Sequence, residues 1–168
     1  MILLCYDGSP SAKHAITSAH AIVGQSPATL LHIWEPPANF LGPDPFGGIE
    51  TWSGPQIVEL EAMALERANR TVEYGVELAR DAGFSADGRL ERADTATWRA
   101  ILDIADGCDA QLIVVGARGL SPLESVLIGS VSNALVHHSS RPVLVVPSEP
   151  AETKDAKGTA DEKDSKGR

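Results

Sequence analysis

Short runs of consecutive apolar residues alternate along the chain with longer stretches in which apolar residues recur every three or four positions. The short runs are typical of buried strands, and the periodic stretches are typical of amphipathic helices. The predicted strands cover residues 2–6, 29–34, 84–92, 112–115 and 143–146. The predicted helices cover residues 9–23, 57–82 and 130–138, with a further helix that is capped by Asp94 or Thr95 and ends before Gly107.

This alternation favours an α/β fold, in which right-handed crossovers place helices on both faces of a parallel sheet. The run 112–115 is apolar throughout, as expected of a parallel strand that is covered on both faces. We therefore expect an open, doubly wound sheet of five parallel strands. Ligands of such sheets bind beyond the carboxyl ends of the strands, near the point where the strand order reverses. This places Asp7, Trp34, Glu35 and the chain from Gly116 onward near a predicted site.

Proline and glycine mark the ends of the first helices. Ser9 followed by Pro10 indicates a helix start, with a hydroxyl at the N-cap and a proline at the first helical position. Gly24 is placed to end this helix in the left-handed conformation, and Gly83 closes the long second helix.

Residues 36–56 contain five prolines and four glycines, which predict a long loop without regular structure. Loops of this length are uncommon in compact domains and tend to be functional or mobile. Phe40, Phe46 and Trp52 lie within it. These rings are expected to pack the loop onto the body or onto a partner chain, with ligand contact as the alternative.

The composition changes after Pro147. Residues 148–168 contain no Leu, Ile, Val or aromatic residue and are rich in charge. Such a segment buries too little apolar surface to offset its ordering entropy. We therefore expect one domain over residues 1–147 and a disordered charged tail over residues 148–168.

The charge balance argues against some classes of partner. The chain carries 14 basic and 23 acidic residues, and removing the tail's 5 − 6 = −1 from the total of −9 leaves −8 on the body. Lys13 is the single lysine of that body. Nucleic-acid and anionic-lipid binding need clustered Lys and Arg, so neither is expected. No apolar run approaches the roughly 20 residues of a membrane span.

The opening apolar run is too short for a secretory signal. The two cysteines, Cys5 and Cys108, have neither metal-ligand spacing nor a disulfide framework. A cytoplasmic protein is the expectation.

The segment after the fourth predicted strand indicates an anion site. It reads Gly116-Ala117-Arg118-Gly119, then nine residues, then Gly129-Ser130 at the start of the last predicted helix. Glycine after a strand lets the backbone turn and approach a ligand. The N–H groups and the positive dipole end of a helix start attract phosphate. The alternative is that Gly116 and Gly119 only form a turn and that Ser130 only caps a helix.

The whole pattern resembles the universal stress protein family. It includes the glycine spacing, Val131, the closing segment 141–147 (Arg-Pro-Val-Leu-Val-Val-Pro), the opening segment 2–9 (Ile-Leu-Leu-Cys-Tyr-Asp-Gly-Ser) and the segment 30–33 (Leu-Leu-His-Ile). The resemblance covers residues 1–147 and implies a Rossmann-like fold of the adenine nucleotide alpha hydrolase type. The intact glycine spacing is typical of the family's ATP-binding branch.

The resemblance also implies roles for single residues. Asp7 would accept hydrogen bonds from the ribose, Cys5 and Tyr6 would line the base side, and Ile33 would meet adenine through its backbone. ATP is expected as the ligand, with Mg²⁺ or Mn²⁺ as the ion that accompanies its phosphates. The residues expected around the phosphates are Gly116, Ala117, Arg118, Gly119, Gly129, Ser130, Val131 and Ser132. Asp7 as a turn carboxylate and Arg118 facing solvent are the alternatives. Glu124 departs from the family, whose members often carry basic or neutral residues there.

Motifs of several enzyme classes are absent from the sequence. No lysine lies between Lys13 and Lys154, which excludes a P-loop kinase or ATPase. His137 and His138 are adjacent, so they point in different directions and cannot share a metal as an i, i+4 pair would. No dinucleotide fingerprint follows the first strand, and no serine stands in a nucleophile elbow.

We therefore expect an ATP-binding, nucleotide-responsive regulatory module rather than an enzyme. An apolar edge strand needs cover. In the family that strand commonly pairs across a two-fold axis, so the resemblance implies a homodimer through Val143–Val146. The alternatives are an interaction protein with a vestigial nucleotide site that binds through residues 36–56, a weak ATPase, or an adenylating or nucleotide alpha hydrolase relative.

Overall fold

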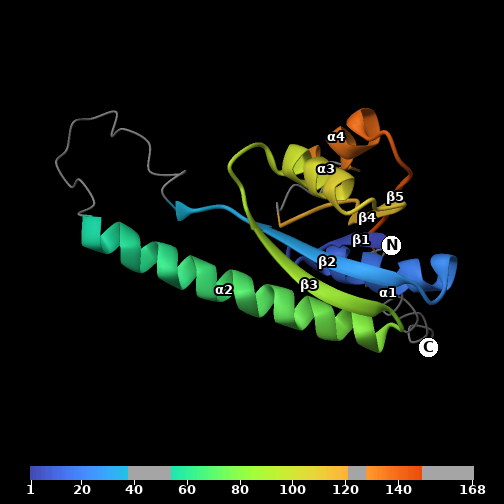
Figure 1. Ribbon diagram of the computed structural model, residues 1–168, viewed down its shortest axis with the longest axis horizontal. Coiled ribbons are helices and arrows are strands. Elements are labelled where there is room, and N and C mark those ends of the chain that lie inside the picture. The colour runs from blue at the N-terminus through green and yellow to red at the C-terminus, as the bar shows by residue number, and fades with distance from the viewer. Residues whose placement is uncertain (38–53, 121–127, 149–168) are drawn as a thin grey trace, which may run out of the picture.

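The computed structural model describes residues 1–37, 54–120 and 128–148. Strands and helices alternate in these ranges (Figure 1). The elements in chain order are β1 (Ile2–Cys5), α1 (Pro10–Val23), β2 (Pro27–Trp34), α2 (Gly54–Asp81), β3 (Ser85–Arg92), α3 (Thr97–Gly107), β4 (Leu112–Gly116), α4 (Ser130–His138) and β5 (Val143–Val146).

The five strands form one sheet in the order β3-β2-β1-β4-β5. Every pair of neighbours is parallel. The predicted fold class, a doubly wound α/β sheet, is therefore confirmed. The chain proceeds outward from β1 to β3 on one side and from β4 to β5 on the other, so the order reverses between β1 and β4. The carboxyl ends of these two strands border the position where such folds bind ligands.

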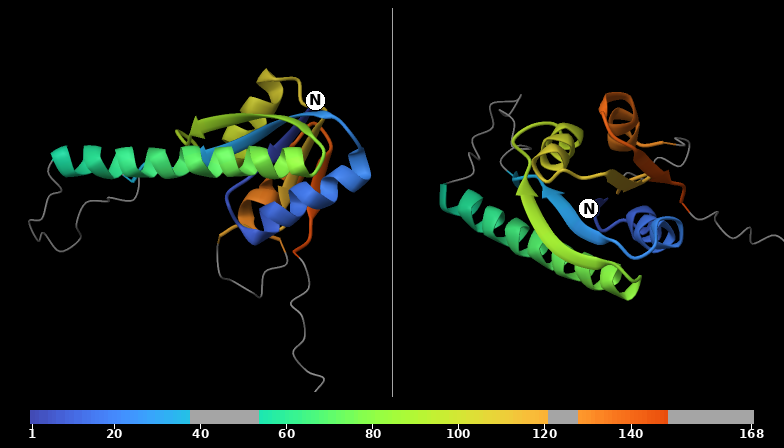
Figure 2. Two further views of the ribbon diagram at one scale, coloured as in Figure 1. Left: turned by 90° about the horizontal axis from the view of Figure 1, so that it is seen from below. Right: turned by 45° about the vertical axis from the view of Figure 1, so that its right-hand side comes forward.

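Helices cover both faces of the sheet, with α1 and α2 on one face and α3 and α4 on the other (Figures 1 and 2). Because successive side chains of a strand point to opposite faces, β1 contributes to both layers. Leu4 and Tyr6 pack with α1 and α2, whereas Leu3 and Cys5 pack with α3 and α4. This double coverage explains the uninterrupted apolar run of the first strand.

The first helix begins as its sequence predicts. The side chain of Ser9 caps α1 by accepting a hydrogen bond of 3.1 Å from the N–H of Ala12. Gly24 ends the helix with a positive φ of 67°, but its ψ of −163° is not that of the left-handed helix. The prediction of a positive φ is confirmed, and the predicted left-handed helical conformation is wrong.

The start of α3 differs from the prediction. The helix begins at Thr97, and its N-cap is Ala96, which makes no side-chain hydrogen bond to the helix. The expected caps, Asp94 and Thr95, precede it by two positions or more. A carboxylate oxygen of Asp94 instead lies 3.5 Å from Nε of Arg92 at the end of β3.

The structure describes the predicted loop 36–56 only at its two ends. Helix α2 starts at Gly54, so the predicted loop 36–56 is wrong for its last three residues. The remaining positions 38–53, with Phe40, Phe46 and Trp52, lie outside the described residues, as does the predicted tail from 149 onward. Within the described ranges, no helix has the length and apolar character needed to cross a membrane.

Candidate functional site

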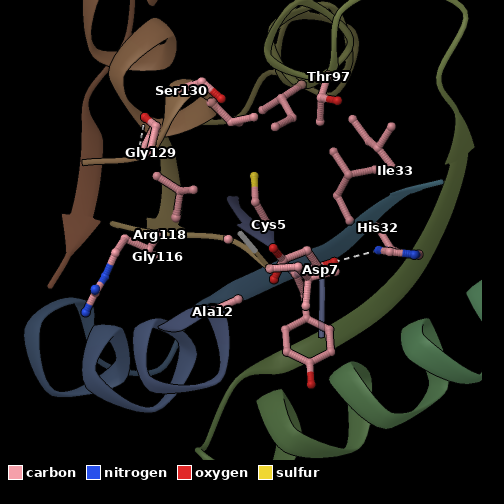
Figure 3. A pocket seen from close by; sticks show the side chains of 18 residues that line it. Cys5, Asp7, Ala12, His32, Ile33, Thr97, Gly116, Arg118, Gly129 and Ser130 are labelled. Atoms are coloured by element: carbon pink, nitrogen blue, oxygen red, sulfur yellow. Dashed lines mark hydrogen bonds between the residues drawn. The ribbon is translucent and has the colours of Figure 1, made fainter. Parts of the chain in front are cut away.

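A cavity of about 300 Å³ opens where the strand order reverses. Gly129 and Ser130 lie on one side of it, Ile33 and Thr97 on the other, and Cys5 and Asp7 between them (Figure 3). The ends of β1, β2 and β4 and the starts of α1, α3 and α4 all contribute. The lining residues are Cys5, Tyr6, Asp7, Ala12, Leu31, His32, Ile33, Thr97, Ile101, Val115, Gly116, Arg118, Gly119, Leu120, Gly129, Ser130, Val131 and Ser132.

The wall between β2 and α3 is largely apolar. Leu31 and Ile33 face the cavity from β2, and Ile101 faces it from the second turn of α3. The sulfur of Cys5 points into the cavity (Figure 3). Burial, and secondly the charge of Asp7, raise the pKa of the Cys5 thiol to about 12. The thiol therefore stays protonated at neutral pH and acts as part of the apolar wall.

Asp7 follows β1 and is held by the turn that leads into α1. Its Oδ1 accepts a hydrogen bond of 2.9 Å from the N–H of Ser9. Gly8 makes this turn possible with a φ of 84°. The other carboxylate oxygen faces residues 116–119, the glycine loop, because a Cβ at Gly119 would lie 2.9 Å from Oδ2 of Asp7. Asp7 thus places negative charge at the middle of the cavity.

His32 on β2 lies beside Asp7 and is fixed by a backbone carbonyl. Its Nδ1 lies 2.8 Å from the carbonyl oxygen of Tyr6, so Nδ1–H is the donor in this pair. Burial lowers the pKa of His32, and the Tyr6 carbonyl and the charge of Asp7 oppose that shift. Neutral His32 with its proton on Nδ1 leaves Nε2 as a hydrogen-bond acceptor.

Hydrogen bonds join the glycine loop to the start of α4. The N–H of Gly129 donates to the carbonyl of Ala117 over 2.7 Å. The hydroxyl of Ser132 lies 2.9 Å from the same carbonyl oxygen and 3.0 Å from that of Gly129. The N–H groups of the first turn of α4 have no intrahelical acceptor. Since Gly129, Ser130 and Val131 line the cavity, the positive end of α4 borders it.

Gly116 has a packing role that its sequence context did not reveal. A Cβ at this position would lie 2.7 Å from Oγ of Ser11 and 2.9 Å from the backbone nitrogen of Ala12. The first turn of α1 therefore occupies the space next to Gly116. The missing side chain brings β4 close to α1, whereas the sequence suggested that it brings the backbone close to a ligand.

Arg118 lines the cavity, but its guanidinium group extends away from the centre (Figure 3). Its Nε donates to the hydroxyl of Ser148 over 3.2 Å. Its backbone N–H donates to the hydroxyl of Ser11 over 3.3 Å. In this conformation the guanidinium group holds the chain after β5 rather than facing the start of α4.

Comparison with known proteins places this chain in a family. A model of the universal stress protein family matches residues 1–147. The chain belongs to the universal stress protein family. A universal stress protein of Thermus aquaticus is 35% identical over 150 residues, which cover 86% of this chain and 96% of that protein. The solved structure of universal stress protein UspA from Lactobacillus plantarum has a TM-score of 0.67 at 23% identity, covering 86% of this chain and 95% of that one.

Two further universal stress proteins of this fold were solved with adenine nucleotides. The protein from Archaeoglobus fulgidus is in complex with dAMP, at a TM-score of 0.54 and 22% identity, covering 86% of this chain and 95% of that one. A family protein from Arabidopsis thaliana has AMP bound, at a TM-score of 0.58 and 16% identity, covering 86% of this chain and 89% of that one. At such identities the likeness shows the shared fold.

The universal stress protein fold brings eleven of the twelve predicted site residues to one cavity. The exception is Ala117, which is buried and offers its carbonyl to Gly129 and Ser132. Tyr6 reaches the cavity, but its ring packs on the opposite face of the sheet, stacked on Tyr74 at 6.4 Å. That these residues bind a nucleotide stays a prediction.

Sequence reasoning missed several residues of the universal stress protein cavity. Leu31 and Val115 lie in predicted strands, where alternation could have assigned them to the cavity face. Thr97 and Ile101 share one face of α3 as an i, i+4 pair, but no sequence signal placed the start of α3 at the cavity. Ala12, His32 and Leu120 complete the missed set.

Metal-binding side chains do not gather in the part of the chain that the structure describes, where no group of three or more His, Cys, Asp or Glu could hold an ion. Asp7 is the carboxylate that lines the cavity. Mg²⁺ in nucleotide sites is commonly bound by one or two carboxylates together with substrate phosphates. Asp7 is the residue predicted to bind the ribose, and the predicted accompanying ion stays a prediction.

Proposed function

We propose that this universal stress protein binds an adenine nucleotide in the cavity between β1 and β4 and acts as a nucleotide-responsive regulatory protein. One observation carries the proposal: the cavity presents an apolar wall, a carboxylate and a helix start in that order. A nucleotide presents a base, a ribose and phosphate in the same order. The AMP and dAMP complexes of two family members support this assignment.

The apolar wall suits the base. Ile33 and Ile101 offer flat apolar contact, and Thr97 at the start of α3 offers a hydroxyl that also donates to Glu35 over 3.3 Å. Ligand pockets are mostly apolar, with a few polar groups that fix the orientation of the ligand. The base would lie between β2 and α3, with Cys5 beneath it.

The carboxylate and the helix start suit the ribose and the phosphate. Asp7 has one oxygen occupied by the N–H of Ser9, which leaves Oδ2 to accept from ribose hydroxyls. The first turn of α4 would bind phosphate through backbone N–H groups, as helix starts do in other nucleotide folds. ATP is the nucleotide that the resemblance to the family's ATP-binding branch implies.

Calorimetric titration of the purified protein with AMP, ADP and ATP tests this proposal. Gly129→Val is the informative variant, since a Cβ there lies no closer than 3.4 Å to the protein and the fold should tolerate it. Its side chain would occupy the approach to the start of α4 and weaken binding by about tenfold or more. Gly107→Val is the matched control, because a Cβ at that glycine meets nothing within 4 Å. Absence of heat with all three nucleotides would refute nucleotide binding and favour an interaction protein with a vestigial site.

We further propose that the protein is a homodimer that pairs through β5. This strand is at one edge of the sheet, and Val143, Leu144 and Val145 are only half-buried along it. An uncovered apolar edge is a template for pairing. Light scattering after size-exclusion chromatography should give the mass of two chains, and Val145→Glu should shift it to one. A monomeric wild-type protein would contradict the proposal.

A further inference from the structure

The cavity contains little positive charge to balance a polyphosphate. Among the described residues, two side chains with formal charge line it, Asp7 and Arg118. The carboxylate of Asp7 faces the glycine loop, close to the space above Gly119. The guanidinium group of Arg118 extends away from the cavity to Ser148. Among the described residues, the start of α4 is therefore the positive group at the phosphate side, and the negative charge of Asp7 lies next to it at the ribose.

Other basic side chains are engaged elsewhere. Lys13 donates to the hydroxyl of Tyr74 over 3.2 Å, and the guanidinium group of Arg99 lies over the ring of Trp98 at 5.1 Å. Arg141 donates to the carbonyl of Ala110 over 2.9 Å. None of the three lines the cavity.

The spacer adds no positive charge either. Between Gly119 and Gly129 the sequence has no lysine or arginine, and its one charged residue is Glu124. The body as a whole carries −8, so its field repels each further phosphate.

The start of α4 can compensate for about one phosphate group. A helix end carries roughly half an elementary positive charge, and its effect falls off within the first turn. The first-turn N–H groups provide donors for the oxygens of a single phosphate. A second and a third phosphate would extend beyond this turn, and each would bring about one more negative charge without a cationic partner.

We propose that the cavity selects nucleoside monophosphates over triphosphates when no divalent metal is present, and that ATP binds well only as its metal complex. The inference rests on the proposed function, because it assumes that the cavity holds an adenine nucleotide. It names the ligand class from the local charge, whereas the resemblance to the family's ATP-binding branch implies ATP. A divalent metal removes the preference because it neutralises two charges of the triphosphate.

Titration calorimetry with AMP, ADP and ATP in EDTA, then in excess MgCl₂, tests the inference. In EDTA, ATP should bind at least about tenfold more weakly than AMP, equivalent to about 1.4 kcal/mol, with ADP between them. Magnesium should reduce this ratio. Equal or tighter binding of ATP in EDTA would overturn the inference and leave nucleotide binding intact. No binding of any nucleotide would instead overturn the proposed function.

A positive charge added at the cavity tests whether the charge close to the phosphates, rather than the net charge of the protein, sets the preference for AMP. Leu120 lines the cavity and is 71% exposed, so Leu120→Lys should fold and place an ammonium group near the added phosphates. Ile22 on α1 is 67% exposed and lies outside the cavity, so Ile22→Lys adds the same charge at a distance.

Leu120→Lys should improve ATP binding relative to AMP in EDTA by about fivefold, whereas Ile22→Lys should leave the ratio within about twofold. Thermal melts of both variants without nucleotide verify that they fold. An equal effect of the two substitutions, or none from Leu120→Lys, would overturn the local explanation.

Discussion

Gly116→Ala should destabilise the protein even though it adds one methyl group. The new Cβ would lie 2.7 Å from Oγ and 2.8 Å from the carbonyl carbon of Ser11, and 2.9 Å from the backbone nitrogen of Ala12. Two of these three atoms belong to the backbone of α1, so rotation of a side chain cannot relieve the overlap. Either α1 or the end of β4 must move, and both are part of the packed core.

The size of the effect follows from overpacking. Forcing an extra methyl into a packed interior costs about 1–3 kcal/mol, and contact with backbone argues for about 2 kcal/mol here. For a domain of this size that corresponds to a fall of roughly 4–8 °C in melting temperature. Gly129→Ala is a matched control, because its Cβ would meet the Ala117 carbonyl oxygen at 3.4 Å with an ordinary φ of −70°. It should change the unfolding free energy by less than about 0.5 kcal/mol.

Urea denaturation without nucleotide, followed by circular dichroism, measures this difference directly. Gly116→Ala should lower the midpoint without changing the slope, as a pure loss of stability does. A variant whose unfolding free energy stays within about 0.5 kcal/mol of wild type would refute the packing argument. Loss of nucleotide affinity at unchanged stability would restore the earlier view that Gly116 serves ligand approach.

Three further predictions concern side chains around the cavity and α3. Burial lowers the pKa of His32 below its ordinary value of 6.5, so the folded state favours the neutral ring. The free energy of unfolding is therefore highest above about pH 6.5 and falls as the pH drops, because the unfolded chain then binds a proton that the folded chain does not. His32→Asn keeps a donor for Tyr6 without titrating there, and urea midpoints should show that it loses less stability than wild type between about pH 7.5 and pH 5. Arg141 donates to the carbonyl of Ala105 in α3 and to that of Ala110 between α3 and β4. Thermal melts should therefore show a loss of about 2 kcal/mol for Arg141→Met, of which Arg141→Lys recovers less than half because lysine lacks the planar fork. With a Cys5 pKa of about 12, iodoacetamide at neutral pH should modify the partly exposed Cys108 well before Cys5, and peptide mapping that finds Cys5 modified first would contradict its burial.

The strand and helix pattern could be predicted because local signals agreed with the tertiary structure. The apolar run of β4 is buried on both faces, and α4 occupies the residues 130–138 that its sequence predicts. The start of α3 could not be predicted in this way. Ala96 has no side-chain cap, while the residues with capping side chains, Asp94 and Thr95, lie before it. Packing of the α3 face that includes Ile101 and Ile104 fixes the helix more strongly than its cap does.

The side chains of the site were harder to predict than its position. Parallel strands bring Asp7 and Gly116 to one sheet edge, and a sequence reveals this once the strand order is inferred. The direction of a long side chain depends on neighbours that are distant in sequence. Arg118 reaches Ser148, thirty residues further along, and Tyr6 packs on Tyr74 of α2. Neither contact has a local signature.

The two parts of the glycine motif, residues 116–119 and residues 129–130, are joined by contacts that do not require a ligand. Ala117 is the predicted site residue that does not line the cavity, yet its carbonyl accepts from both Gly129 and Ser132. These bonds hold the end of β4 against the start of α4. The motif therefore positions α4 relative to the sheet. Because α4 is held there, the free N–H groups of its first turn border the cavity and form the predicted anion site.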